Sequence, residues 1–406
     1  MTKDTNRYFF VLGRYPDLST KEIRSVLTKI GYFWSIFYHT NEILIIDMAG
    51  EVDVLSLNKI LGGTVKIGVI LKELSLTQTF DDIQEYLTSD ALFTDILAIK
   101  NEKVAFGISY YSENNSSYKI FVPQLLRTIK EHLKIQGFKP HFPRQTTKTL
   151  SSASVEKNNL LTTGAEVVLV ETKDALLLGK TVSVQDFELF SKRDYGRPVR
   201  DMESGVMPPK LARMMLNLSQ KNIDAALLDP FCGSGTVLQE ALLLDFTDIT
   251  GADKSEKAVS DTQQNIEWLI MEEKLTHKPE IVHSDVEELA KTTKKTFDLI
   301  VTEPYMGPNS KGLRNFDDMK KNKEELENLY LTSWKAFAKL LKKDGEVVMI
   351  LPIFHYKNTY LKMDIIEKIP SLGFEHIALS EKRRKSLIIG NRYDFVLREI
   401  IHFRKI

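Results

Sequence analysis

The segment with the clearest chemical potential is the loop Asp229-Pro-Phe-Cys-Gly-Ser-Gly-Thr236, which joins an apolar strand to a predicted helix. Gly233 and Gly235 let the backbone bend tightly and approach a ligand, and the start of the helix offers N–H groups to a carboxylate. Leu238 stands where the dinucleotide fingerprint needs a third glycine. The loop therefore argues against NAD, although the turn alone also fits a ligand-free turn or another nucleotide site.

Two more acids follow predicted strands. Asp253 ends the strand in GAD, where an acid can accept hydrogen bonds from both hydroxyls of a ribose. Asp285 ends the next strand in HSD and could accept from an adenine amino group. Each of the three acids precedes a helix and could simply cap it. Three acids at consecutive strand ends, in register with a glycine turn, favour a ligand site over caps alone.

The elements that must hold these residues alternate strictly after about residue 207. The predicted strands are AALLD, ITGAD, EIVHSD, FDLIVTEP and EVVMILPIF, with helices predicted from about Thr236, at SEKAVSDTQQNIEWLI and across Glu324 to Leu341. This alternation predicts a doubly wound parallel sheet whose ligands bind at the carboxyl ends of the strands. Residues 207–406 are thus expected to form an α/β, Rossmann-like domain.

The first part of the chain is predicted to be α+β. Strands RYFFVLG, YFWSIFYH, EILIIDM and TVKIGVILKEL accompany a helix from Ser19 to Ile30, with a capping box to Glu22, and a second helix at DVLSLNKIL. A helix at DDIQEYLTSD, a strand at KVAFGISYY, a basic helix over 122–136 closed by Gly137 and a hairpin at AEVVLVETKDALLLGKTV follow. HFPRQTTKTLSSASVEKNN is expected to be irregular, and 187–206 to be a linker without periodicity.

Composition sets further bounds. The 406 residues suggest two or three domains, with 43% hydrophobic and 27% charged residues and a formal net charge of zero. No apolar run is long enough to span a membrane and the start lacks a signal peptide, so the expected location is the cytoplasm, without a membrane partner. The histidines show no metal-ligand spacing, so no metal is expected.

The charge is locally uneven. Between Lys119 and Leu150, seven Lys and Arg side chains stand against Glu131 alone, a local net charge of +6. A second basic cluster is Lys382-Arg383-Arg384-Lys385. Such clusters can simply solvate helix faces, or they can bind phosphate. The seven basic residues are Lys119, Arg127, Lys130, Lys134, Lys139, Arg144 and Lys148.

The motifs DPFCGSGT, GAD, HSD and TEPYMGP resemble those of class I S-adenosylmethionine methyltransferases that modify exocyclic amines of nucleobases. The segment DYGRPVRDMESGVMPPKLARMMLNLS resembles the corresponding segment of tRNA guanosine N2-methyltransferases that carry an N-terminal THUMP domain. FFVLGRYPDLSTKEI resembles the ferredoxin-like unit of that family. The resemblance implies a ferredoxin-like unit at 1–79, a THUMP-like RNA-binding domain at 80–186, a linker at 187–206 and the methyltransferase domain at 207–406.

The resemblance also implies S-adenosylmethionine as cofactor, tRNA as substrate and, as in some relatives, a small activator subunit. Methylation at C5 of a pyrimidine is excluded, because it needs a thiolate after the fourth strand and the only cysteine, Cys232, lies in the cofactor loop. The expected cofactor contacts are Asp229, Pro230, Phe231, Gly233, Gly235, Thr236, Asp253, Lys254, Asp285 and Val286.

The expected catalytic residues follow the fourth strand, in Thr302-Glu303-Pro304-Tyr305. Glu303 and nearby backbone carbonyls would accept the N–H bonds of a guanine amine, and Tyr305 would stack on the base. The pattern of the family is Asp or Asn, then Pro-Pro, then Tyr or Phe, so Thr302 fills the acid column and Glu303 replaces the first proline. Either Glu303 supplies the acceptor or the protein only binds RNA; we favour an enzyme, since the cofactor acids are present. A DNA adenine-N6 or cytosine-N4 methyltransferase is the alternative enzyme.

Overall fold

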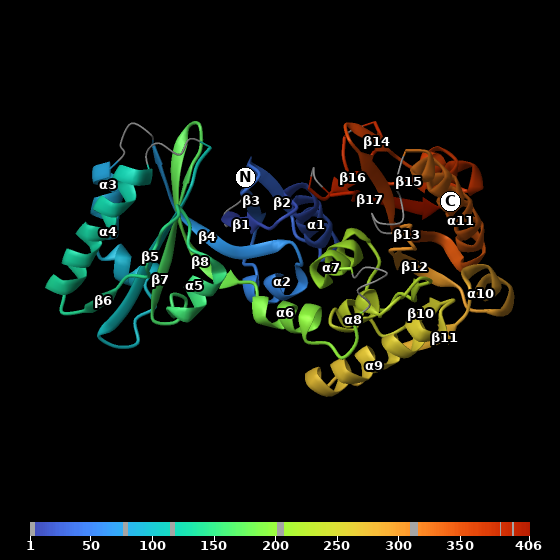
Figure 1. Cartoon of the computed structure of the whole chain (residues 1–406). Helices are drawn as coiled ribbons and strands as arrows, with labels where there is room; N and C mark the ends of the chain where they lie inside the picture. Colours follow the sequence, from blue (N-terminus) through green and yellow to red (C-terminus); the bar gives the residue numbers. More distant parts are fainter. Residues whose placement is uncertain are drawn as a thin grey trace. The chain divides into compact units, whose positions relative to one another are not determined.

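A computed structural model gives the fold of two compact units, each described here by itself (Figure 1). The first unit comprises Met1–Thr20 and Ile30–Phe187, and the second comprises Lys21–Lys29 and Glu188–Ile406. The structure describes residues 5–75, 80–113, 118–200, 207–308, 316–381, 383–391 and 394–406.

One mixed sheet organises the first unit. Among its described residues, eight strands lie in the order β2-β3-β1-β4-β8-β7-β5-β6, with β5 parallel to both β6 and β7 and the other pairs antiparallel. Strand β4 pairs with β8, so the sheet runs without a break across the expected boundary at residues 79 and 80, and that boundary stays a prediction. The strands are β1 (Thr5–Leu12), β2 (Trp34–His39), β3 (Ile43–Ala49), β4 (Thr64–Ser75), β5 (Lys103–Tyr111), β6 (Lys139–His141), β7 (Gly164–Glu171) and β8 (Ala175–Val184).

The helices of this unit follow the expected order, with two corrections. Helix α1 begins before Ser19, whose hydroxyl donates to the Tyr15 carbonyl, so the expected capping box with Glu22 is wrong. A short helix, α5, forms in the stretch expected to be irregular, because Ser151 caps it by accepting from the Ser154 amide. The elements are α1 (Pro16–Lys29), α2 (Val54–Ile60), α3 (Phe80–Leu87), the π-helical turn η1 (Leu92–Ile96), α4 (Tyr118–Ile135) and α5 (Ser152–Lys157).

The second unit is built on a nine-stranded sheet, as counted over its described residues. Strands β11-β10-β9-β12-β13 are parallel neighbours in that order, and β17 and β15 extend the sheet in antiparallel fashion. The expected doubly wound core is confirmed, whereas the antiparallel edge was not predicted. The strands are β9 (Leu227–Asp229), β10 (Ile249–Asp253), β11 (Glu280–His283), β12 (Phe297–Thr302), β13 (Leu341–Tyr356), β14 (Thr359–Leu361), β15 (Phe374–His376), β16 (Leu387–Ile389) and β17 (Val396–Lys405).

Helices cover both faces of this sheet. Leu227 and Leu228 are consecutive on β9 and therefore point to opposite faces, yet both are fully buried. The expected linker at 187–206 begins with helix α6, which buries Phe190 and Arg193; residues 201–206 lie outside the described residues. The helices are α6 (Phe187–Tyr195), α7 (Pro209–Leu218), α8 (Thr236–Leu242), α9 (Glu256–Glu273), α10 (Val286–Thr292), α11 (Phe316–Leu340) and the 3-10 turns η2 (Asp364–Glu367) and η3 (Ile369–Leu372).

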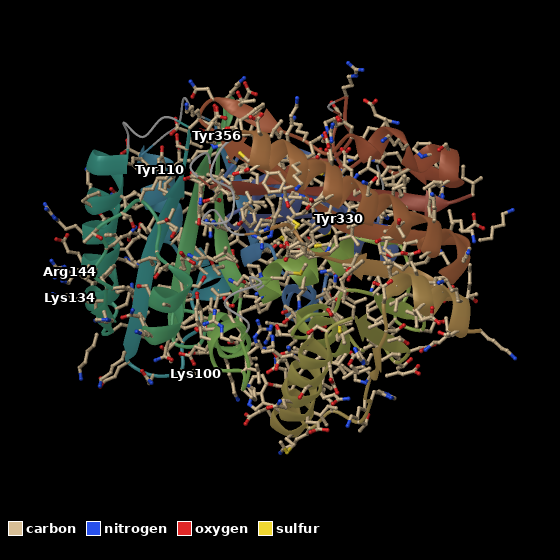
Figure 2. All side chains as sticks on the ribbon, turned by 45° about the vertical axis from the view of Figure 1, so that its right-hand side comes forward. Lys100, Tyr110, Lys134, Arg144, Tyr330 and Tyr356 are labelled. Carbon is tan, nitrogen blue, oxygen red and sulfur yellow. The ribbon has the colours of Figure 1, made fainter. Side chains whose placement is uncertain are left out.

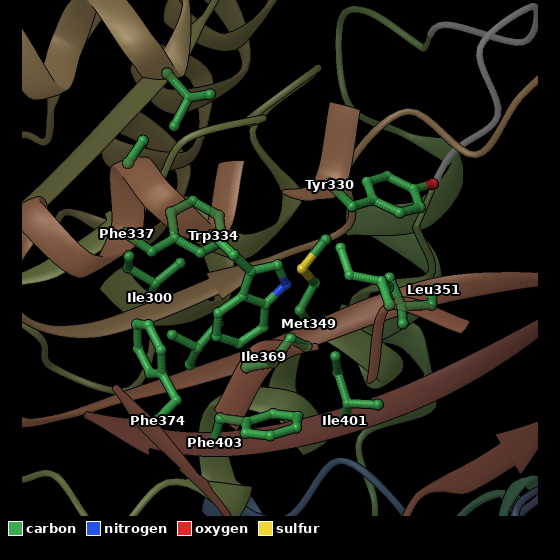
Figure 3. Close-up of a cluster of buried hydrophobic side chains, with 14 of the residues drawn as sticks. Ile300, Tyr330, Trp334, Phe337, Met349, Leu351, Ile369, Phe374, Ile401 and Phe403 are labelled. Atoms are coloured by element: carbon green, nitrogen blue, oxygen red, sulfur yellow. The ribbon is translucent and has the colours of Figure 1, made fainter. Parts of the chain in front are cut away.

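An aromatic cluster fixes α11 on one face of the sheet (Figure 3). Trp334 is fully buried and meets Phe337, Phe374 and Phe403 edge to face, with ring centroids 5.5, 4.9 and 5.3 Å away. Edge-to-face pairs at these separations add to the stabilisation that burial already gives. The same buried cluster includes Ile300 of β12 and Met349 of β13, so α11 packs on these strands as well. Within the described residues, none of the helices is both long and apolar enough to cross a membrane.

Candidate active site

The loop after β9 has the backbone shape that its glycines allow. Gly233 and Gly235 have φ values of +55° and +83°, which other residues adopt only with strain. A Cβ on Gly235 would also lie 2.9 Å from Cγ2 of Thr262, whereas a Cβ on Gly233 would meet nothing within 4 Å. Gly235 is therefore required for packing against α9, and Gly233 leaves open space above the loop.

Neighbouring elements hold this loop in place. The Thr262 hydroxyl donates to the Gly233 carbonyl at 2.7 Å, and the Asn265 side chain donates to the Ser234 carbonyl at 2.9 Å. A Cβ on Gly251 would lie 2.5 Å from Cδ1 of Leu238, so a larger residue on β10 would require the Leu238 side chain of α8 to shift. Sequence reasoning missed these three residues, because their role depends on contacts between α9, β10 and the loop.

Asp229 lies almost completely buried at the end of β9. Its Oδ1 accepts from the Thr302 hydroxyl at 2.6 Å and from the Phe231 amide at 3.2 Å. Burial raises its pKa to about 7, although these two hydrogen bonds oppose the shift; the charges of Asp253 and Glu303 add to it. Near neutral pH this carboxyl group is therefore close to half protonated and would gain from a nearby cation.

Asp253 and Asp285 both accept hydrogen bonds from backbone amides, but from different elements. Asp253 Oδ2 accepts from the Gly233 amide at 3.0 Å, and its Oδ1 accepts from the Ser255 amide at 2.9 Å. Asp285 caps α10, with Oδ1 accepting from the Glu287 amide at 2.9 Å. The capping alternative is thus correct for Asp285 alone, since Ser255 caps α9 and Gly235 precedes α8. Carboxylate oxygens each accept more than one hydrogen bond, so these acids can still bind hydroxyl or amino groups.

A cleft of about 350 Å³ gathers most of the expected residues. A smaller hollow of about 70 Å³ shares Phe231, Gly233, Ser234 and Glu303 with it and adds Asp229 and Thr236. Pro230, Gly235, Val286 and Thr302 line neither space. The cleft residues expected from the sequence are Phe231, Gly233, Asp253, Lys254, Asp285, Glu303, Pro304 and Tyr305.

The segment after β12 brings one carboxylate and one ring to this cleft. The Glu303 carboxylate pairs with Arg398 of β17, with 2.6 Å between Arg398 Nε and Oε1. Tyr305 is half exposed, and its backbone carbonyl accepts from the buried hydroxyl of Tyr330 at 2.7 Å. Burial raises the pKa of Tyr330 well above its usual range, so this hydroxyl remains a donor. Arg398 and Tyr330 were not predicted from the sequence.

Thr302 does not face the cleft. It is fully buried, and its hydroxyl is used to hold Asp229. Cys232 is buried as well, and burial raises the pKa of its thiol, which is therefore not a thiolate nucleophile. Arg197, which precedes the cofactor loop in the chain, is buried and donates to the Thr236 hydroxyl at 2.8 Å.

Comparison with known proteins places this site in a known domain type. Residues 197–370 match the family described as "RMKL-like, methyltransferase domain". The tRNA (guanine(10)-N2)-dimethyltransferase of Methanothermobacter thermautotrophicus is 31% identical over 184 residues, which are 45% of this chain and 48% of that protein. The protein of the same name from Methanocaldococcus jannaschii is 26% identical over 230 residues, 55% of this chain and 62% of that protein. The matches thus cover less than two thirds of either relative.

Solved structures show a similar fold along nearly the whole chain. TrmN from Thermus thermophilus superposes with a TM-score of 0.57 at 16% identity, over 98% of this chain and all of that one. A protein described as a "possible methylase" from Clostridium difficile 630 gives 0.52 at 15% identity, over 99% and 98% of the two chains. At these identities the likeness concerns the fold alone. The expected resemblance is thus confirmed at the level of the domain, since residues 197–370 match an RMKL-like methyltransferase domain.

Proposed function

We propose that this protein is an S-adenosylmethionine-dependent RNA methyltransferase that modifies the exocyclic N2 amine of a guanosine in tRNA. The observation that carries the proposal is the position of Glu303, a carboxylate that lines the same cleft as Asp253 and Asp285, next to the half-exposed ring of Tyr305. The names of the two curated relatives supply the substrate class and the guanine amine.

The cleft fits the proposed cofactor. Its volume of about 350 Å³ lies within the usual range for small-molecule sites. Asp253 ends β10 and Asp285 follows the adjacent parallel strand β11 by two residues; the register pairs Asp253 with His283, and both acids line the cleft. They would accept from ribose hydroxyls and an adenine amino group, while the open face of Gly233 admits the rest of the molecule. Bound S-adenosylmethionine supplies an electrophilic methyl group on a positively charged sulfur.

The residues after β12 would bind and orient the base that accepts the methyl group. Tyr305 offers a ring face on which a base taken out of its stack can lie. Glu303 accepts the N–H bonds of the guanine amine and aligns the nitrogen with the methyl carbon. As the N–C bond forms and the C–S bond breaks, the nitrogen loses a proton, which the Glu303 carboxylate receives and passes to solvent.

A carboxylate also favours guanine over the other amine-bearing bases. The two oxygens of Glu303 can accept from N1–H and the N2 amine of guanine at the same time, because a carboxylate is acceptor-only when ionised. Adenine and cytosine place an acceptor nitrogen beside their amino groups and would leave one carboxylate oxygen facing a lone pair. This difference supports guanine rather than the adenine or cytosine of a DNA methyltransferase.

The first unit would bind the RNA backbone. Lys139 and Lys148 of its basic segment pair with Glu102 and Glu42. Further exposed cations of the segment are Arg127, Lys130, Lys134 and Arg144, and Figure 2 shows Lys134 and Arg144 at one edge of this unit. Exposed cations of this kind bind phosphates without reading sequence. An activator subunit stays a prediction from the family resemblance.

The test is transfer of labelled methyl from S-adenosylmethionine to unmodified tRNA, followed by digestion to nucleosides. We expect N2-methylguanosine, and a loss of turnover of about 10²- to 10⁴-fold in Glu303→Gln with cofactor affinity retained. Asp253→Ala should instead weaken cofactor binding, by roughly 10- to 100-fold if hydrogen bonds to a charged group are lost. Glu267→Gln, an exposed acid of α9 paired with Lys278, is the matched control and should behave as the wild type.

Other products would point elsewhere. N6-methyladenosine or N4-methylcytidine would contradict the guanine assignment, and label in DNA but not in RNA would favour the DNA methyltransferase. Cofactor binding without label in any RNA would contradict the enzyme and leave an RNA-binding protein. Full activity of Glu303→Gln would contradict the proposed role of Glu303 in accepting the proton of the guanine amine.

A further inference from the structure

We propose that Arg398 is the positioning residue of the active site, holding the Glu303 carboxylate so that Oε2 faces the guanine amine. The inference rests on the proposed function and adds to it a residue from the antiparallel edge of the sheet. Arg398 does not touch the substrate in this scheme. It acts through the acid that does.

The guanidinium of Arg398 reaches Glu303 from two strands away. Arg398 pairs with Pro352 of β13 on one side and with Ile389 of β16 on the other. Strand β13 lies between β17 and β12, and neighbouring strands are about 4.8 Å apart, so the side chains of Arg398 and Glu303 together bridge roughly 10 Å across β13. A long, donor-rich side chain such as arginine is suited to this reach.

The contact between the two groups is unequal. Arg398 Nε donates to Oε1 at 2.6 Å, whereas Nη2 is 3.5 Å from Oε2. The first is a strong charge-assisted hydrogen bond, and the second lies at the outer limit for one. Oε1 is therefore anchored, and Oε2 is the oxygen with more capacity to accept from a substrate amine.

The partner of Arg398 is well defined by the sheet. Successive residues of a strand point to opposite faces, so the neighbouring acid Glu399 lies on the other face of β17. Glu399 is fully buried and pairs there with Arg384 through two hydrogen bonds of 2.7 and 3.0 Å. Glu399 thus does not compete with Glu303 for Arg398. The Glu303 side chain is 13% exposed and that of Arg398 is 32% exposed, so water screens this pair less than a surface pair.

The position of Glu303 in the chain explains why an anchor is needed. Thr302 is the last residue of β12, and its backbone is fixed by its register with Met349. Glu303 follows the strand and, with the rest of the described residues 303–308, has no regular secondary structure. An acid at position 302 would be oriented by the strand itself, but that position holds a threonine bonded to Asp229. An acid one residue later needs a contact from outside its own segment, and Arg398 provides it.

The test is a double-mutant cycle on purified full-length protein with tRNA. Arg398→Met should lower kcat by roughly 10- to 100-fold, as expected when a reacting group is misplaced by about an ångström, with the Kd for S-adenosylmethionine unchanged. In a Glu303→Gln background the same substitution should have little further effect, because its partner has lost its charge. Arg398→Lys should recover part of kcat, since lysine offers one charged donor but not the fork of arginine.

A matched control lies on the same strand. Arg404 of β17 also makes an ion pair, with Glu375 at 2.7 Å, so Arg404→Met removes an arginine and a pair from β17 away from Glu303. It should leave kcat unchanged. An equal loss in Arg404→Met, a full Arg398→Met effect in the Glu303→Gln background, or an unchanged kcat in Arg398→Met would each overturn the inference. A wild type without N2-methylguanosine product contradicts the proposed function itself, so the two failures are distinct.

Discussion

Glu166 in the sheet of the first unit and Asp229 in the sheet of the second unit are both buried carboxylates, and their surroundings differ in opposite ways. In the first unit, Glu166 of β7 is fully buried and its Oε1 accepts from Lys66 Nζ at 2.5 Å. The hydroxyls of Ser109 and Thr181 donate to it at 2.5 and 2.6 Å. In the second unit, Asp229 of β9 is almost as deeply buried, but within the described residues its hydrogen bonds come from neutral donors, the Thr302 hydroxyl and the Phe231 amide.

The difference separates a structural acid from one suited to a ligand. The charge of Glu166 is balanced by an ammonium group within the same sheet, and Lys66 also donates to the Leu150 carbonyl at 2.6 Å. A buried ion pair of this kind leaves nothing for a ligand to supply. Among the described residues, the hydrogen-bond donors to Asp229 carry no positive charge, and burial raises the pKa of this carboxyl group to about 7. A positively charged molecule in the hollow that Asp229 lines would supply the counter-charge and favour its ionised form.

Removal of the Lys66 ammonium group beside Glu166 should give the largest effect on stability. We expect Lys66→Met to lower the free energy of unfolding by about 3 to 5 kcal/mol, because it leaves the Glu166 charge buried without its partner. Chemical denaturation of the variant and the wild type measures the difference. Lys139→Met, which breaks the exposed pair with Glu102, is the control and should cost about 1 kcal/mol or less.

A double variant sharpens this prediction. Lys66→Met with Glu166→Leu removes both charges and should recover most of the lost stability, since paired buried charges contribute little net energy. If Lys66→Met alone is as stable as the wild type, Glu166 is not the balanced structural acid described here.

The raised pKa of Asp229 should be measurable in the pH dependence of the free energy of unfolding. A carboxyl whose pKa is raised on folding stabilises the fold below its unfolded pKa, and this contribution is lost as the pH rises through the folded value of about 7. We expect the ligand-free wild type to lose about 2 to 3 kcal/mol relative to Asp229→Asn between about pH 5 and pH 8. Denaturant titrations of both proteins across this range measure it, and parallel curves would contradict the raised pKa.

Local patterns in the sequence predicted the parts of the site that local structure makes. The glycine loop, the acids Asp229 and Asp253 and the alternation of strands and helices follow from propensity and periodicity. Helix α6 escaped prediction because its buried face includes a charged residue: Arg193 donates to the buried Glu240 at 2.6 Å, so its apolar periodicity is weak.

Contacts between distant residues could not be predicted in the same way. Glu303 and Arg398 are 95 residues apart, and their pairing depends on β17 lying two strands from β12. The hydrogen bond from the Tyr330 hydroxyl to the Tyr305 carbonyl could not be predicted either, because any buried tyrosine of α11 fits the apolar pattern. The order of β13, β17 and β15 depends on how the strands pair in the folded sheet, and it cannot be predicted from the residues of any one strand.

The smallest expected effect isolates the hydroxyl that holds Asp229. Thr302→Val keeps the side-chain volume but removes the donor, and a lost hydrogen bond to a buried charge costs roughly 1 to 3 kcal/mol. The Thr302 hydroxyl lowers the pKa of Asp229 by favouring its ionised form, so its removal should raise that pKa further. The cost should therefore be near its full size at about pH 8 and smaller at about pH 5, where Asp229 is protonated in both proteins. Ser333→Ala, which removes a buried hydroxyl bonded to the Leu329 carbonyl, is the control, and its cost should not change with pH. A pH-independent cost for Thr302→Val would mean that Asp229 does not titrate in this range and that the two buried carboxylates are alike after all.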